Sequence, residues 1–127
     1  MPESRHVLIV DDDEEVRHLF SDIIMLLGFN PTAVGSGVAA LQQIKATHFD
    51  LVILDVRVPD MNGLETFKAI RQFNSSVPVV LTSGFGMDKH VQEALSMGAL
   101  LCLEKPFDVI RAMNTLREIV EKESPRR

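Results

Sequence analysis

Four short apolar segments of the chain each end close to polar side chains that can hold a metal ion or phosphate oxygens. The segments are VLIV (7–10), LVIL (51–54), PVVL (78–81) and LLCL (100–103). The polar residues that follow them are Asp11 to Asp13, Asp55, Thr82 with Ser83, and Lys105. Carboxylates bind Mg²⁺, whereas hydroxyl and ammonium groups hold phosphate oxygens. If the segments are parallel strands, their carboxyl ends share the sheet edge where open α/β sheets bind ligands.

The acidic residues at two of these strand ends predict a metal site. Asp11 and Asp12 follow the first segment, and Asp55 follows the second. If these strands are neighbours, the three carboxylates repel and raise one another's pKa, and a divalent cation such as Mg²⁺ relieves the repulsion. The alternative is that the acids favour the positive end of a helix dipole, the role we expect for Asp13, and that Asp55 caps a loop.

Thr82 and Lys105 add a hydroxyl and a positive charge at the same edge. Each has an ordinary explanation, because threonine favours strands and lysine is common on surfaces. Together with the carboxylates, their placement predicts that both hold a phosphoryl group. Each signal is weak alone, and the joint placement is specific.

Helical periodicity fills the gaps between the apolar segments. Apolar residues between 16 and 27 recur at intervals of three and four residues, acids precede them, and Gly28 follows. Four further helices are predicted from their caps and apolar faces: after Ser36 with Val38, after Asn62-Gly63, around Val91 before Gly98, and after Asp108 with Val109.

Residues 31–34, PTAV, are the only candidate for a strand between the first two helices. The segment begins with Pro31, which suits an edge strand. The other four segments are continuously apolar, which predicts interior or near-interior strands covered on both faces. Five β-α repeats with right-handed crossovers predict a doubly wound parallel α/β sheet in one domain spanning residues 1–127.

Composition narrows the class of protein. The chain has 127 residues, a net charge of −5 and no basic stripe, so we expect no direct binding to nucleic acid. The single Cys102 excludes an internal disulfide and fits a reducing compartment. The N-terminal region has no signal-peptide pattern and no membrane span. A soluble cytoplasmic protein is therefore expected.

From about residue 6 to residue 121 the chain resembles a bacterial two-component response-regulator receiver domain of the chemotaxis-regulator type. VLIVDDD, LVILDVRVPDMNG, VVLTSG and LEKPF match the family's four signature stretches in order and spacing. The resemblance implies a flavodoxin-like sheet with strand order 2-1-3-4-5, five helices and a cis Lys105–Pro106 peptide. It also implies residue roles: Asp55 as phosphoacceptor; Asp55, Asp12, Asp11 (largely through water) and the Arg57 carbonyl for Mg²⁺; and Thr82 and Lys105 for the phosphoryl group.

The function implied by this resemblance is a phosphorylation switch. A sensor histidine kinase or phosphotransfer protein would pass a phosphoryl group to Asp55. The domain would promote its own phosphorylation and dephosphorylation without being an enzyme in the usual sense. Helix 4, strand 5 and helix 5 would present the changed surface to an effector. We expect a monomer or a weak phosphorylation-dependent dimer.

One position departs from the family pattern, and two other functions remain to be compared. Receivers usually carry Tyr or Phe three residues before the lysine, where this chain has Cys102, predicted to be a core thiol. A Mg²⁺-dependent phosphohydrolase with an aspartyl intermediate is the first alternative, because Asp11 and Asp13 superficially fit a DxD pair. A phosphorylation-independent interaction domain is the second, and the intact set of acids, Thr82 and Lys105 argues against it.

Overall fold

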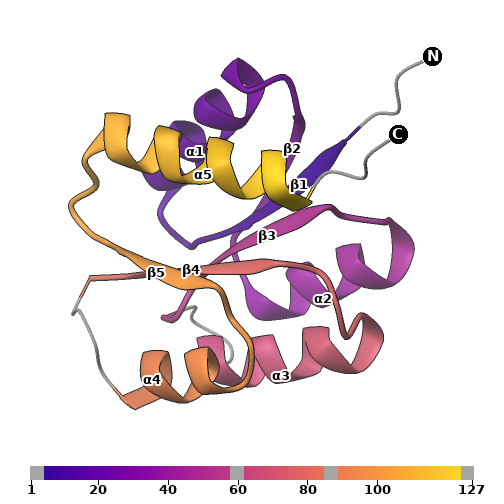
Figure 1. The fold of residues 1–127 in the computed structure, drawn as a ribbon. Coiled ribbons are helices and arrows are strands. Elements are labelled where there is room, and N and C mark those ends of the chain that lie inside the picture. Colours follow the sequence, from indigo (N-terminus) through magenta and orange to yellow (C-terminus); the bar gives the residue numbers. More distant parts are fainter. Residues whose placement is uncertain (1–4, 58–61, 85–88, 124–127) are drawn as a thin grey trace.

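The computed structural model, which describes residues 5–57, 62–84 and 89–123, has one parallel sheet between two layers of helices (Figure 1). The strands in this part of the chain are β1 (His6–Val10), β2 (Asn30–Val34), β3 (Leu51–Asp55), β4 (Val79–Ser83) and β5 (Leu101–Glu104). The helices are α1 (Glu14–Leu26), α2 (Gly37–Ala46), α3 (Gly63–Phe73), α4 (Lys89–Ser96) and α5 (Val109–Glu123). The sheet order is β2-β1-β3-β4-β5, which confirms the predicted doubly wound fold and its strand order.

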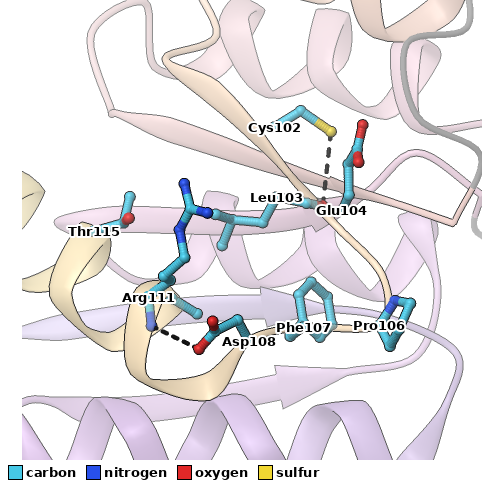
Figure 2. A pocket seen from close by; sticks show the side chains of 9 residues that line it. Cys102, Leu103, Glu104, Pro106, Phe107, Asp108, Arg111 and Thr115 are labelled. Carbon is cyan, nitrogen blue, oxygen red and sulfur yellow. Dashed lines mark hydrogen bonds between the residues drawn. The ribbon is translucent and has the colours of Figure 1, made fainter.

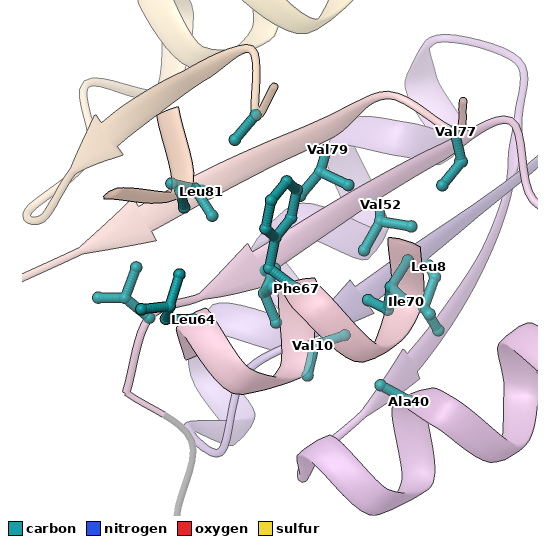
Figure 3. Close-up of a cluster of buried hydrophobic side chains, with 14 of the residues drawn as sticks. Leu8, Val10, Ala40, Val52, Leu64, Phe67, Ile70, Val77, Val79 and Leu81 are labelled. Carbon is teal, nitrogen blue, oxygen red and sulfur yellow. The ribbon is translucent and has the colours of Figure 1, made fainter. Parts of the chain in front are cut away.

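Helices cover both faces of the sheet. α1 and α5 lie on one face, and α2, α3 and α4 lie on the other (Figure 1). On β3, Leu51 and Ile53 pack toward α1 and α5, whereas Val52 and Leu54 pack toward the other layer. Figure 3 shows this second cluster, in which Phe67 of α3 lies over the sheet. Burial on both faces explains why the central strands are continuously apolar.

The helix boundaries follow the capping signals in the sequence. Asp13 caps α1 by accepting a hydrogen bond from the backbone N–H of Glu15, and Ser36 caps α2 in the same manner. Gly28 and Gly98, the predicted helix stops, have φ angles of 89° and 111°, which favour glycine. No helix in the described ranges is both long and apolar enough to cross a bilayer.

β5 differs from the expectation of a strand covered on both faces. It forms the second edge of the sheet, and Leu101, Cys102 and Leu103 are only partly buried. Cys102 packs against the cluster on the α2, α3 and α4 side, which agrees with the prediction of a core thiol, although the residue is only partly buried. Its Sγ atom lies 3.8 Å from the carbonyl oxygen of Leu103 (Figure 2). The apolar pattern of this segment did not reveal that β5 lies at an edge of the sheet, where one side of the strand has no neighbouring strand.

Candidate functional site

The strand ends bring Asp11, Asp55, Thr82 and Lys105 to one side of the sheet's carboxyl edge. Side chains alternate between the two faces along a strand. Each of these four residues continues the row that faces α1 and α5 on its own strand. Asp55 and Thr82 are also direct partners in the ladder between β3 and β4. Topology and register therefore place the predicted residues together, although they are far apart in sequence.

Lys105 bridges the two buried carboxylates. Its Nζ atom donates a hydrogen bond to Asp55 Oδ2 at 3.2 Å and forms an ion pair with Asp11 Oδ2 at 3.1 Å. The side chains of Asp11 and Asp55 are only 3% and 5% exposed, whereas that of Lys105 is 25% exposed. Burial removes the carboxylates from water, and this shared ammonium group compensates part of the charge of both. The Lys105–Pro106 peptide is cis, as the resemblance implied.

Backbone N–H groups fix the remaining oxygen of each buried carboxylate. Asp11 Oδ1 accepts a hydrogen bond from the backbone of Asp13 at 2.9 Å, and Asp55 Oδ1 accepts one from the backbone of Arg57 at 3.1 Å. Each carboxylate thus has one oxygen tied to its own loop and one facing Lys105. This geometry holds both groups in one orientation before any ligand arrives.

Asp12 completes an acidic cluster that fits a metal ion. Its side chain is exposed, and one oxygen from each of Asp11, Asp12 and Asp55 lies within 4.8 Å of the others. Mg²⁺ binds carboxylate oxygens and keeps several water ligands, so a half-open set of three acids suits it. The donor set therefore fits the expected cofactor. The suggested ligation by the Arg57 carbonyl stays a prediction.

Thr82 presents a hydroxyl group that lacks a partner within the described ranges. The residue is 1% exposed, and Oγ1 makes no hydrogen bond there. A buried, unsatisfied hydroxyl costs free energy, which calls for an explanation. A ligand with acceptor oxygens at this edge would supply one.

Burial and charge perturb both ends of the central ion pair. Burial is the largest effect on Asp55 and raises its pKa; the backbone N–H of Arg57 opposes this, Asp11 adds to it and Lys105 opposes it. Burial alone would lower the pKa of Lys105, but its contact with Asp11 and the charges of Asp55 and Asp11 raise it overall. Ionised Asp55 is therefore disfavoured by its surroundings and Lys105 stays charged.

Two residues of the site were not found by sequence reasoning. Arg17 donates a hydrogen bond from Nη1 to the backbone carbonyl of Asp11 at 2.9 Å. Gly63 packs so closely under the acceptor strand that a Cβ atom there would lie 2.8 Å from the carbonyl oxygen of Asp55. In the sequence, the Asn62-Gly63 pair predicts only a helix start, and no pattern marks Arg17.

The site and the fold define a class: a doubly wound domain with an acidic cluster, a hydroxyl and a lysine at its carboxyl edge. The chain belongs to the response regulator receiver domain family, whose model matches residues 7–117. It is thus a receiver domain of two-component signal transduction, which confirms the family inferred from the sequence motifs.

Relatives place such domains in several protein contexts. The chain is 35% identical over 112 residues to the transcriptional regulatory protein ZraR of Klebsiella oxytoca, covering 88% of this chain and 25% of that protein. It is 35% identical over 113 residues to the sensor protein EvgS of Escherichia coli K12, covering 87% of this chain and 9% of that protein. The chain therefore spans about a quarter or less of these two relatives.

A solved structure of similar length supports the same fold. Chemotaxis protein CheY4 of Vibrio cholerae superimposes with a TM-score of 0.83 at 28% identity, covering 92% of this chain and 99% of that chain. The similarity thus extends over nearly the whole of both chains.

Proposed function

We propose that the domain accepts a phosphoryl group on Asp55 in a Mg²⁺-dependent reaction with a sensor histidine kinase or phosphotransfer protein. The observation that carries this proposal is the setting of the Asp55 carboxylate. It is buried, held by a backbone N–H and by Lys105, and adjoins two further carboxylates and the hydroxyl of Thr82. These are the groups that nucleophilic phosphoryl transfer needs at one point.

The reaction is an in-line displacement at phosphorus. A carboxylate oxygen of Asp55 forms a bond to phosphorus while the bond from phosphorus to the partner's imidazole nitrogen breaks, which gives an aspartyl phosphate. Lys105 is close enough to move from the carboxylates to a phosphoryl oxygen, and Thr82 can donate its hydroxyl to another. Mg²⁺, when held by Asp11, Asp12 and Asp55, offsets negative charge on the transferring oxygens. Positioning and electrostatics supply most of the rate.

An apolar hollow beside Lys105 is the proposed docking place for the phosphoryl donor. It has a volume of about 350 Å³ and is lined mainly by side chains of α1 and of the segment after β5. Val16, Leu19, Pro106 and Phe107 supply its apolar surface. A partner helix seated here would bring its phosphohistidine next to Asp55.

The output is proposed to leave through α4, β5 and α5. Thr82 lies near the end of β4, and Lys105 directly follows β5. Attraction of both residues toward a phosphoryl group would therefore shift the conformation of α4, β5 and α5. A hollow of about 380 Å³ lies here, and Cys102 and Arg111 are among the residues that line it. Figure 2 shows these lining side chains between β5 and the start of α5. Because Cys102 replaces a ring, the switch needs little side-chain movement. The effector, the cytoplasmic location and the monomer or weak dimer stay predictions.

The phosphohydrolase alternative is not favoured. It needs Asp11 and Asp13 to act together as a DxD pair, but Asp13 is exposed and its Oδ1 accepts the N–H of Glu15 as a helix cap. Autodephosphorylation by water, at the slower rate of a switch, is the hydrolytic step we propose instead.

Intact-mass measurement after incubation with acetyl phosphate tests the proposal. Wild type and Asp22→Asn, a matched change at an exposed acid on α1, should each gain one phosphoryl group when Mg²⁺ is present. Asp55→Asn, and wild type in excess EDTA, should gain none. Full phosphorylation of either of the last two samples would refute the assignment.

A further inference from the structure

Arg17 holds the loop that carries the acidic cluster. It lies in the first turns of α1, is half-buried, and donates a hydrogen bond from Nη1 to the backbone carbonyl of Asp11 at 2.9 Å. A guanidinium donor makes this bond stronger than an uncharged donor would. α1 is therefore tied to the end of β1 at the first residue of the cluster.

This hydrogen bond acts on the peptide that joins the two neighbouring acids. The carbonyl group of Asp11 and the N–H of Asp12 belong to one planar unit, so a donor that fixes the oxygen also fixes the direction in which the chain enters Asp12. The Asp11 side chain has its own supports in the Asp13 N–H and Lys105. The Asp12 side chain is exposed and has no hydrogen-bond partner within the described ranges, so its direction depends on this backbone.

Gly35 leaves the space that Arg17 occupies. A Cβ atom at this position would lie 3.2 Å from Arg17 Nη1 and 3.9 Å from Arg17 Cζ. The distance to Nη1 is shorter than an ordinary van der Waals contact. The loop after β2 therefore adjoins the guanidinium, and the backbone of Asp11 is also bonded to β2 through Val34 at 3.1 Å. Arg17 thus joins three segments at the edge of the acidic cluster.

We infer that Arg17 is a positioning residue for the metal: its hydrogen bond to the Asp11 carbonyl orients the Asp11–Asp12 peptide so that the Asp12 carboxylate meets Mg²⁺. This inference rests on the proposed function of the acidic cluster. Charge alone predicts the opposite sign, because a guanidinium near a cation site repels the cation. Removal of Arg17 tightens Mg²⁺ binding if its charge is what matters and weakens binding if its hydrogen bond matters.

Titration calorimetry with Mg²⁺ alone separates these outcomes. We expect Arg17→Met to raise the Mg²⁺ dissociation constant about 10-fold, the lower end of losses seen when a group that orients a metal ligand is removed. Arg17→Lys, which keeps the charge and one donor, should fall between Arg17→Met and wild type. His18→Gln, at the next and largely exposed position of α1, is the matched control and should bind like wild type.

A second measurement keeps a folding defect apart from a loss of positioning. The Mg²⁺ concentration that half-saturates the phosphorylation rate with acetyl phosphate should rise in Arg17→Met, while the rate at saturating Mg²⁺ returns to the wild-type value. If Arg17→Met does not fold, Arg17→Lys and Gly35→Ala, which crowds the guanidinium, carry the same test.

The possible failures are distinct. Unchanged or tighter Mg²⁺ binding in the folded Arg17 variants overturns the inference. If an Arg17 variant has a lower melting temperature in EDTA but the same Mg²⁺ dissociation constant as wild type, Arg17 supports the fold and does not position the metal ligand, which overturns the inference as well. Absence of Mg²⁺ binding by wild type overturns the proposed function itself.

Discussion

Lys105 should stabilise the metal-free domain through both buried carboxylates, and a double-mutant cycle can measure this. Its Nζ lies 3.1 Å from Asp11 Oδ2 and 3.2 Å from Asp55 Oδ2. At an effective dielectric constant of about 20, each attraction is worth about 5 kcal/mol before desolvation is counted. Desolvation cancels much of this, and breaking a buried pair typically costs about 3–5 kcal/mol. Since Lys105 is partly exposed, we expect Lys105→Met to lower the free energy of unfolding by about 3 kcal/mol.

Asp55→Asn should behave in the opposite sense. The raised pKa of Asp55 means that the folded state binds its proton more tightly than the unfolded state does. Its ionisation therefore costs stability as pH rises from the unfolded pKa through the folded pKa, and the neutral variant avoids this cost at neutral pH. With Asp55 neutral, Lys105→Met removes one attraction instead of two and should cost about 1.5 kcal/mol, half the loss expected in wild type. The coupling energy is then about 1.5 kcal/mol, above the usual error of additivity.

Urea unfolding in EDTA is the assay for this cycle. Far-UV circular dichroism is the suitable probe because the chain contains neither Trp nor Tyr. Additive effects of the two substitutions, or a Lys105→Met variant as stable as wild type, would show that Lys105 does not bridge the carboxylates.

Three further perturbations test separate parts of the site. Mg²⁺ should stabilise wild type by about 2.7 kcal/mol at 100 times its dissociation constant. Asp12→Asn should lose most of this stabilisation by Mg²⁺, yet in EDTA its melting temperature should be no lower than that of wild type. A wild-type melting temperature that does not change with Mg²⁺ would exclude the metal site. Thr82→Val should raise the free energy of unfolding in urea by about 1 kcal/mol, because the substitution removes a buried, unsatisfied hydroxyl group. The variant should also accept phosphoryl groups more slowly, and a phosphorylation rate equal to that of wild type would remove Thr82 from the mechanism. Gly63→Ala should lower the free energy of unfolding by about 1–3 kcal/mol, because its Cβ meets the β3 backbone, and a neutral result in urea would contradict that packing.

Strand and helix signals in the sequence predicted a doubly wound parallel sheet, and the family resemblance supplied the strand order that brings the site residues together. The polar residues after each apolar segment share one edge once the strands are parallel, and the caps at Asp13 and Ser36 behave as their residue types predict. Two helix positions show the limit of periodicity. Val38 and Val109, predicted on apolar faces, are 52% and 43% exposed, and each lies in the first turn of its helix.

Contacts made by long side chains were not predictable. The sequence predicts Lys105 only as a counter-charge to the acids, and the register of β1, β3, β4 and β5 places it between two carboxylates. Arg17 reaches a backbone carbonyl six residues earlier in the chain, across a turn whose path no sequence pattern describes. Such contacts depend on backbone geometry more than on residue type.

The location of the phosphoryl group tests the central claim most directly. Borohydride reduces an acyl phosphate to an alcohol, so peptide mass spectrometry after phosphorylation with acetyl phosphate and Mg²⁺ can identify the residue that carried it. We predict reduction at Asp55 alone. Reduction at Asp11, at Asp12 or at any other residue, with Asp55 unmodified, would contradict the account.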